Sequence, residues 1–412
     1  MNQLYGNALV GQSGGPTAAI NASLCGVIEA SLVAHDAGLI GTLYGMRNGL
    51  DGLFSEDFVD LFAHFSDPPS RELLKRTPAA VLGSCRRKLP AVENGSDVYE
   101  EALRIFRKYN IRYFFYIGGN DSMDAVAKLS QYIEGQSYEM RVVGVPKTID
   151  NDLPETDHTP GFGSAAKYIA TTVHEILRDC SVYRIPAVTL VEVMGRDAGW
   201  LTTASALPAV IGAPGPDLIY LPERPFSMEQ FYSDLKNAFV RHPNVVVAVS
   251  EGIRFADGGY VGAGAQSGVT DVFGHRYLGG TGKVLESAVK NTFGCKVRSV
   301  ELNLPQRCAA HLLSCTDIRE SRAVGAYCVK AALHGESGCM GVILRKPGSA
   351  YHVRYATVPI RCVANRVRHV PDTYINAAGN GITDACIGYL QPLIRGEVRP
   401  VFRNGLPMHY IL

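Results

Sequence analysis

The sequence lacks several features that mark specialised classes of protein. Its ten cysteines are scattered and no two form a CxxC pair, which disfavours a zinc site or a disulfide framework and favours thiols in a reducing compartment. No run approaches the roughly 18 to 20 uninterrupted apolar residues that a membrane helix needs. Residues 1–6 show no basic region followed by an apolar run, so no signal peptide is predicted and we expect a cytoplasmic protein.

An excess of charge of one sign is missing as well. Lysine and arginine total 40 against 39 aspartate and glutamate, so nothing drives general binding to nucleic acid or to an anionic membrane. A small-molecule partner is therefore favoured. Hydrophobic residues make up 46% of the 412 residues and charged residues 19%, which allows substantial buried cores. At roughly 150 residues per domain, this length favours two large domains.

Five apolar, β-prone runs each lead into a polar loop. The runs cover residues 8–10, 111–117, 141–145, 188–193 and 245–249. Strands that alternate with helices form parallel sheets, and such sheets bind ligands beyond the carboxyl ends of their strands. We therefore expect all five loops at that end of the predicted sheets. One glycine-rich stretch, residues 255–282, has few apolar anchors and predicts a mobile loop.

Two glycine pairs stand where an anion could bind. Gly14-Gly15 and Gly118-Gly119 each follow a predicted strand and precede a predicted helix, so that backbone and helix amides can approach a phosphate. Tight packing of loop on helix explains either pair alone equally well. Neither pair belongs to a GxxxxGK[ST] motif, and no GxGxxG follows the first strand, which disfavours a Walker-type nucleotide site and a nicotinamide enzyme.

Residues 147–152 combine an amine, a hydroxyl and two carboxylates at a predicted strand end. Phosphoryl transfer to an alcohol requires a carboxylate that accepts the hydroxyl proton and cations that stabilise the charge on the transferred group. An Asn-Asp pair alone would indicate an ordinary helix N-cap, but Lys147 immediately before it favours chemistry. Arg196 and Glu251, at neighbouring strand ends, suit the phosphate and the hydroxyls of a sugar phosphate.

Together these segments resemble the phosphofructokinase family. The matching segments come in the family's order and approximate spacing: 14–15, 118–122, 146–152, 194–196 and 250–252. The resemblance spans most of residues 8–330, and the string Pro-Lys-Thr-Ile-Asp-Asn-Asp is highly specific. It implies an α/β fold of two Rossmann-like domains with largely parallel sheets and crossover helices. The donor domain would cover 1–155, completed in part by roughly 306–412, and the fructose 6-phosphate domain 156–305, completed by C-terminal segments.

The resemblance also implies roles for single residues. Asp150 would take the proton from the sugar 1-hydroxyl, Asp152 would help to place magnesium-bound phosphates, and Glu251 would hold sugar hydroxyls. The implied catalytic set is Asp150, Lys147, Asp121 and Arg196. The implied substrate contacts are Thr148, Ile149, Asp152, Met194, Gly195, Glu251, Arg298 and Arg307. Donor contacts are implied for Gly14, Gly119 and Arg86, and a metal contact for Asn120.

Two positions predict the phosphoryl donor. Family members that use ATP usually carry glycine at the positions of Asp121 and Lys147. A carboxylate at 121 would lie where the α-phosphate of a nucleotide must go, and like charges in a sheltered cleft repel strongly. Lys147 would stabilise the pyrophosphate transition state. The sequence therefore predicts a reversible, Mg²⁺-supported transfer from pyrophosphate to fructose 6-phosphate, giving fructose 1,6-bisphosphate and phosphate, in glycolysis and gluconeogenesis.

Departures from the family pattern leave two alternatives open. One is an ATP-dependent 6-phosphofructokinase in which Asp121 rotates clear of the nucleotide, and the other is a non-catalytic protein that binds sugar phosphate. Asn120 replaces the usual aspartate on the metal side, and Leu304 replaces a usual histidine or tyrosine. The resemblance further implies a homodimer that lends an arginine across its interface, for which Arg184 is a candidate despite its larger spacing from Met194.

Overall fold

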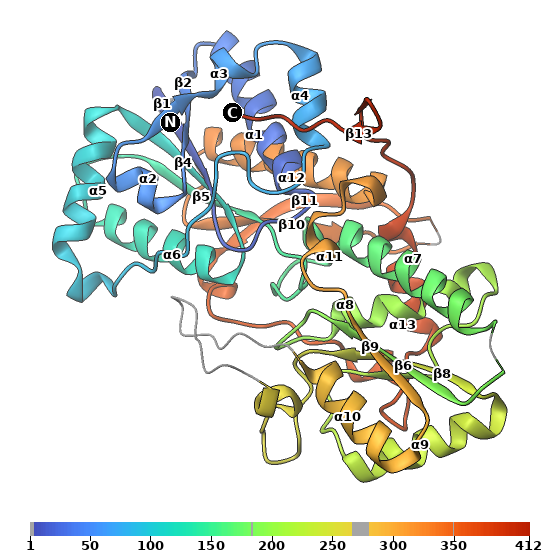
Figure 1. Ribbon diagram of the computed structural model, residues 1–412. Helices are drawn as coiled ribbons and strands as arrows, with labels where there is room; N and C mark the ends of the chain where they lie inside the picture. Colours follow the sequence, from blue (N-terminus) through green and yellow to red (C-terminus); the bar gives the residue numbers. More distant parts are fainter. Residues whose placement is uncertain (1–3, 183, 266–279, 349) are drawn as a thin grey trace.

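Two β-sheets, each covered by helices, divide the chain into two halves that are stacked one above the other in Figure 1. The computed structural model describes residues 4–182, 184–265, 280–348 and 350–412. Of the stretch predicted to be a mobile loop, residues 266–279 lie outside these ranges. None of the described helices is both long and apolar enough to cross a membrane.

The larger sheet has seven strands in the order β11-β10-β5-β4-β1-β2-β3. These strands are β1 (Gly6–Gln12), β2 (Ile40–Met46), β3 (Phe58–Asp60), β4 (Ile111–Gly118), β5 (Arg141–Pro146), β10 (Cys339–Arg345) and β11 (Val353–Pro359). The five inner strands pair in parallel, whereas β3 and β11 are antiparallel strands at the two edges. The alternation of strands and helices in the sequence thus produces the expected, largely parallel sheet.

Helices cover both faces of this sheet, which explains why its central strands are apolar throughout. The covering helices are α1 (Ile20–Asp36), α5 (Ser96–Lys108), α6 (Asn120–Glu134) and α12 (Cys315–Leu333). Successive residues of a strand point to opposite faces. Phe115 accordingly joins the core beneath α1 and α12, and its neighbours Phe114 and Tyr116 join the core beneath α5 and α6.

The smaller sheet has four parallel strands in the order β7-β8-β6-β9. Its strands are β6 (Ala187–Val193), β7 (Leu218–Tyr220), β8 (Asn244–Ser250) and β9 (Lys296–Glu301). The helices packed on it are α7 (Phe162–Cys180), α8 (Trp200–Thr203), α9 (Met228–Arg241) and α10 (Thr281–Phe293). α9 and α10 share a core with Val245 and Val247, whereas α7 and α8 lie on the opposite face with Val246.

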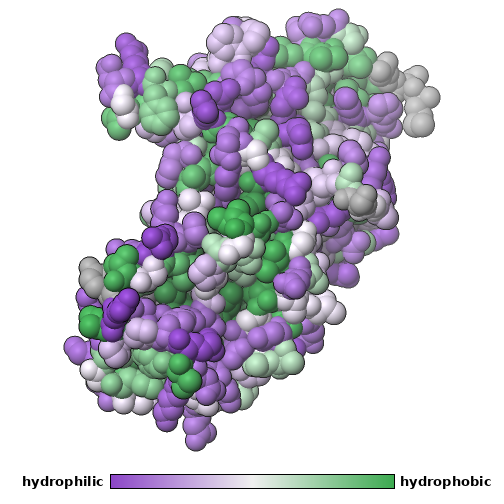
Figure 2. Space-filling model, turned by 90° about the vertical axis from the view of Figure 1, so that its right-hand side faces the viewer, coloured by the Kyte–Doolittle hydropathy of each residue, from purple (hydrophilic) through white to green (hydrophobic). Residues whose placement is uncertain are grey.

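The chain passes between the two halves more than once. It enters the smaller-sheet half after β5, returns through α12 to supply β10 and β11, and then crosses again. The remaining elements are α2 (Leu50–Phe54), α3 (Leu61–His64), α4 (Pro68–Lys75), α11 (Pro305–Cys308), α13 (Asp384–Leu390) and the hairpin of β12 (Phe402–Arg403) and β13 (Leu406–Pro407). Figure 2 shows a mostly polar face that narrows to a waist between the halves.

Candidate active site

A cleft of about 770 Å³ opens between the carboxyl ends of the two sheets. All five loops predicted from the sequence contribute to it. The residues lining it are Gly14–Thr17 after β1, Gly119–Ser122 after β4, Lys147–Asp150 and Asp152 after β5, Met194, Arg196 and Asp197 after β6, and Glu251 after β8, together with Arg86, Asn303, Leu304, Arg307, Asn365 and Val367. The cleft therefore gathers residues that lie more than 200 positions apart in the sequence.

Lys147, the first residue after β5, is a buried lysine on the cleft wall, only 3% exposed. Its ammonium donates a hydrogen bond to the carbonyl oxygen of Gly15 at 2.5 Å, which joins the loops after β5 and β1. Burial lowers the pKa of Lys147 from its usual 10.5 to about 8, with the charge of Asp150 opposing this shift. The ammonium therefore remains mostly protonated at neutral pH.

Asp150 and Asp152 form a pair of carboxylates on the loop that follows β5. The backbone N–H of Asp150 donates to the hydroxyl oxygen of Thr148 at 3.1 Å. Burial raises the pKa of Asp150, and the positive charges of Arg196 and Lys147 oppose this rise. Burial also raises the pKa of Asp152 to about 7, with the negative charge of Asp150 adding to the effect. Ionisation of Asp150 thus disfavours ionisation of Asp152.

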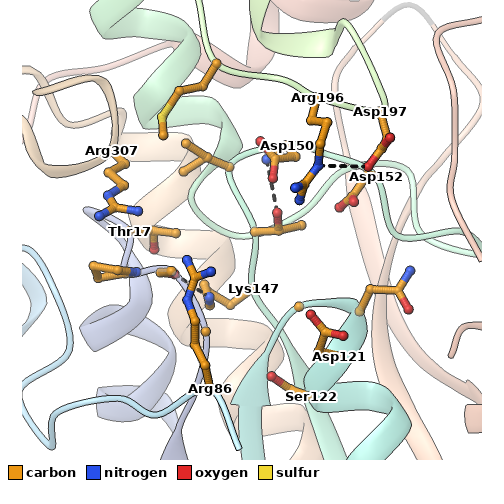
Figure 3. A pocket seen from close by; sticks show the side chains of 18 of the residues that line it. Thr17, Arg86, Asp121, Ser122, Lys147, Asp150, Asp152, Arg196, Asp197 and Arg307 are labelled. Carbon is orange, nitrogen blue, oxygen red and sulfur yellow. Dashed lines mark hydrogen bonds and ion pairs between the residues drawn. The ribbon is translucent and has the colours of Figure 1, made fainter. Parts of the chain in front are cut away.

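The loops after β6 and β8 meet on the other side of the cleft. Gly195 adopts a φ of +133°, where a side chain would also meet the carbonyl oxygen of Ala198 at 2.6 Å, so only glycine fits. Its N–H donates to a carboxylate oxygen of Glu251 at 3.1 Å. Burial raises the pKa of Glu251 to about 8. Figure 3 shows the guanidinium of Arg196 extending into the cleft beside Asp150, with its Nε 3.3 Å from a carboxylate oxygen of Asp197.

Three cationic side chains converge on one side of the cleft, two from the larger-sheet half and Arg307 from α11, which follows β9. Figure 3 shows Arg86, Lys147 and Arg307 reaching toward the same space. Burial lowers the pKa of Arg307, and the positive charge of Arg86 contributes to the shift. Cations that lower one another's pKa lose free energy unless an anion lies among them. This side of the cleft therefore has the electrostatic character of a phosphate site.

Asp121 stands in the first turn of α6, opposite Asp150 and Arg196 in the close view of Figure 3. The ammonium of Lys88 lies 3.8 Å from one of its carboxylate oxygens, and both side chains are partly exposed. Its neighbour Asn120 turns both polar groups of its side chain to another segment. The amide oxygen accepts the backbone N–H of Asn365 at 2.6 Å, and the amide nitrogen donates to the carbonyl oxygen of Arg366.

The structure does not bring every predicted site residue to the cleft. Arg298 lies on the exposed edge strand β9, beside a small recess of about 20 Å³ that the amino-terminal residues of β6 also line. The cleft lies beyond the carboxyl ends of the strands, so Arg298 cannot reach the cleft of its own chain. Arg184 is exposed in the connection that enters β6, on the same distant side. Asn120 does line the cleft, but residues 365 and 366 bind both polar groups of its side chain, and its metal contact stays a prediction.

Other lining residues escaped the sequence reasoning. Thr17 and Ser122 sit next to the glycine pairs that were singled out, so their place after a strand could have indicated them. Asn365 and Val367 come from a segment that carries no recognisable motif. Leu304 lines the cleft with 53% of its surface exposed and has no polar side-chain atom to offer a phosphate.

A cleft between two Rossmann-like halves, with converging cations on one side and paired carboxylates at its centre, defines a phosphotransferase that acts on a small anionic substrate. A family profile described as Phosphofructokinase matches residues 7–332. The chain belongs to the phosphofructokinase family.

Relatives and solved structures match the chain over nearly its full length. The chain is 42% identical to the pyrophosphate–fructose 6-phosphate 1-phosphotransferase of Halomonas elongata, with 97% of this chain and 94% of the relative covered. It is 41% identical to the protein of the same name from Methylococcus capsulatus, with 98% and 96% covered. The crystal structure of a pyrophosphate-dependent phosphofructokinase from Nitrosospira multiformis superposes with a TM-score of 0.88 at 36% identity, covering 98% and 96%.

Proposed function

We propose that the chain transfers a phosphoryl group from pyrophosphate to the 1-hydroxyl of fructose 6-phosphate, giving fructose 1,6-bisphosphate and phosphate in a reversible reaction. The observation that carries this proposal is the placement of Asp121 and Lys147 in one cleft, with the carboxylate at the start of α6 and the buried ammonium after β5. The names of the relatives described above support it independently.

The choice of donor rests on space and charge around Asp121. Its carboxylate, paired with Lys88, occupies the start of α6, where the positive end of the helix would otherwise attract another phosphate. A nucleoside triphosphate would bring its α-phosphate against this carboxylate, whereas pyrophosphate ends before reaching it. Lys147 and Arg86 hold the two phosphates of the shorter donor, and Arg307 contacts the phosphate of fructose 6-phosphate.

The chemical step needs one base and several cations. The carboxylate of Asp150 accepts the proton of the sugar 1-hydroxyl, whose oxygen forms a bond to the terminal phosphorus as the bridging P–O bond of pyrophosphate breaks. The positive charges of Arg196 and Lys147 oppose the rise that burial causes in the pKa of Asp150, and they stabilise the charge that moves onto the departing phosphate.

Magnesium fits the oxygen donors on the donor side of the cleft. Mg²⁺ retains several waters and is held by one or two carboxylates together with substrate phosphates, and Asp152, which lines the cleft, would offer a carboxylate of this kind. The amide oxygen of Asn120, which already accepts one hydrogen bond, contributes through water. Bound magnesium neutralises pyrophosphate and polarises the bond that breaks.

The two halves divide the substrates between them. The larger-sheet half, residues 1–155 completed by part of 306–412, binds the donor, and the smaller-sheet half, residues 156–305 with C-terminal segments, binds fructose 6-phosphate. The chain acts as a homodimer in which Arg298, remote from its own cleft, reaches the sugar phosphate of the neighbouring subunit. Its exposure on an edge strand supports this assignment.

The direct test is a coupled assay for fructose 1,6-bisphosphate in which purified protein receives fructose 6-phosphate, Mg²⁺ and one donor at a time. We expect turnover with pyrophosphate and little with ATP. Efficient turnover with ATP would favour an ATP-dependent enzyme, and binding of fructose 6-phosphate without turnover on either donor would favour a non-catalytic protein. Formation of pyrophosphate from fructose 1,6-bisphosphate and phosphate tests reversibility in the same preparation.

A further inference from the structure

A short C-terminal segment ties the donor side of the cleft to the loop that carries the paired carboxylates. We call residues 365–370 the strap. In Figure 1 the orange-red chain that follows β11 runs between the two halves. The strap lies outside the part of the chain that the family profile matches, residues 7–332, and no motif in the sequence identifies it. Its role has to be argued from its contacts.

The first end of the strap holds the start of α6. The backbone N–H of Asn365 donates to the amide oxygen of Asn120, and the amide nitrogen of Asn120 donates to the backbone carbonyl of Arg366. The side chain of Asn365 also donates to Asp124, one turn further along the helix, at 2.9 Å. These bonds fix the strap against the turn that bears Asp121.

The middle of the strap binds the loop after β5 through the hydrogen bonds of Arg368. Its guanidinium donates to the backbone carbonyl of Asn151 from two nitrogens, at 3.2 and 3.0 Å. A third nitrogen donates to the carbonyls of Thr156, at 2.9 Å, and of Asp157. The backbone N–H of Arg368 donates to the carbonyl of Asp152 at 2.8 Å. One residue thus binds four carbonyl oxygens within a stretch of seven residues.

The loop needs this support because of its backbone conformation. Asn151, directly after Asp150, has a φ of +54°, a left-handed conformation that costs free energy for any residue other than glycine. Its side chain is bound on both sides, accepting from the N–H of Thr159 at 3.0 Å and donating to Tyr389 at 3.1 Å. The turn directs several carbonyl oxygens toward one point, where their partial negative charges repel unless a cation lies among them.

The far end of the strap is anchored in the other half. The guanidinium of Arg368 lies 4.5 Å from the ring of Trp200, and the indole nitrogen donates to the carbonyl of Arg368 at 3.0 Å. The N–H of Val370 donates to Glu223 at 3.0 Å, and the same carboxylate oxygen accepts the N–H of Gly199, in the loop after β6. The strap therefore contacts, in order, the start of α6, the loop after β5 that carries Asp150 and Asp152, and the loop after β6.

We propose that Arg368 is a positioning residue that holds Asp150 at the geometry required for proton transfer, and that the strap fixes the position of the loop after β5 relative to α6. This inference rests on the proposed function for the reaction it serves. Arg368 does not line the cleft and touches no substrate; it acts through the backbone that follows Asp150. Arginine suits the task because its planar fork can bind several carbonyls at once, whereas a lysine ammonium is a point charge that cannot reach all of them.

The test compares Arg368→Gln, Arg368→Lys and the control Arg361→Gln, which removes the same charge from an exposed position shortly before the strap. In Arg368→Gln we expect kcat to fall about 100-fold while the KM values for fructose 6-phosphate and pyrophosphate change less than about threefold. Arg368→Lys should recover only part of the rate, and Arg361→Gln should match the parent chain. Thermal unfolding of each variant checks that it is folded at the assay temperature.

Hydrogen exchange supplies a readout that does not depend on activity. The amides of Asp157 and Thr159, bonded to Ile343 and to Asn151, should exchange at least about tenfold faster in Arg368→Gln than in Arg361→Gln. Unchanged exchange would overturn the claim that Arg368 holds the loop. Faster exchange with an unchanged kcat, or a raised KM for the sugar with kcat intact, would overturn its positioning role. An inactive parent chain would defeat the proposed function, while the exchange result would still decide whether Arg368 holds the loop.

Discussion

The ammonium of Lys88 lies 3.8 Å from the carboxylate of Asp121, so the start of α6 carries its own ion pair at the place where a longer donor would need room. Under the proposed function, the carboxylate of this pair is what excludes ATP from the cleft. The carboxylate occupies the anion-binding end of the helix, and Lys88 partly neutralises it without leaving a vacant cationic site for another phosphate.

Replacing Asp121 should therefore change the choice of donor. We expect Asp121→Gly to raise kcat/KM for ATP by about 10- to 100-fold, because the repulsion between the carboxylate and the α-phosphate disappears. Asp121→Asn separates charge from size, since it removes the charge and keeps the volume. A rise in both variants indicates repulsion, a rise only with glycine indicates steric exclusion, and no rise in either contradicts the role of Asp121. Initial rates with each donor measure the effect.

Removing the proposed base should slow the reaction without releasing the sugar. For Asp150→Ala we expect kcat to fall by about 10²- to 10⁴-fold, the usual loss when a general base is removed. Binding of fructose 6-phosphate, measured by calorimetry, should change little, because cations and Glu251 supply most contacts. Asp36→Asn, at the exposed end of α1, is the matched control. Turnover close to that of the control would exclude Asp150 from the mechanism.

The reaction should slow in alkaline solution as Lys147 loses its proton. The pKa of Lys147 is lowered to about 8, so the free enzyme holds the charge below this pH and loses it above. We expect kcat/KM for pyrophosphate to fall as pH rises through about 8. Lys147→Arg keeps a charge that does not titrate in this range and should move the fall to higher pH, whereas Lys147→Met should lower the rate at every pH. An identical alkaline fall in Lys147→Arg would assign it to another group.

A dimer that shares Arg298 should show complementation between two inactive chains. If each cleft uses its own Asp150 and the partner's Arg298, a mixed dimer of Asp150→Ala and Arg298→Ala contains one intact cleft out of two. Half of the dimers in an equal mixture are mixed, so co-refolding should restore about a quarter of the parent activity. No recovery, with mixed dimers present by mass spectrometry, would place Arg298 outside the partner's cleft.

The stability of the loop after β5 should depend on pH through His158. This buried histidine contacts Asp157 at 2.8 Å and Glu320 at 2.6 Å, and Arg345 and Tyr351 face the same carboxylates. Burial alone would lower the pKa of His158, but the hydrogen bonds to Asp157 and Glu320 outweigh it, so the pKa is raised.

A histidine whose pKa is higher in the folded state than in the unfolded state stabilises the fold below its unfolded pKa, and this stability is lost as pH rises through the folded value. The substitution His158→Gln should therefore lower the free energy of unfolding by about 3 kcal/mol at pH 6 and by less at pH 9. Chemical unfolding at both pH values measures the difference, with the exposed His352→Gln as control. An equal cost at both pH values would mean that folding leaves the pKa of His158 unshifted.

That the five loops lie together could be predicted from the sequence, because strand ends in parallel sheets meet at one edge and each loop directly follows a recognisable strand. Lys147 and Asp150 could be found in this way, and so could Arg196 and Glu251. Arg298 could not be placed, since nothing in the sequence reveals that β9 is an edge strand or which end of it the arginine occupies. Arg368 left no signal either, because its partners are backbone carbonyls, which every residue has.

The contacts of Asn120 could not be predicted for a related reason. Its position at the start of α6 was foreseen, but the distant segment that binds its side chain could not be, because 245 residues separate Asn120 from Asn365. Contacts of this kind depend on the path of the chain between the two halves.

That path also bears on how the protein is made. β5 pairs with β4 on one side and with β10 on the other, and β10 begins only at Cys339. While the ribosome is still synthesising the intervening residues, β5 exposes a bare apolar edge to which another unfinished chain can pair. Nascent chains of this protein therefore need protection of that edge while residues 147–338 are being synthesised.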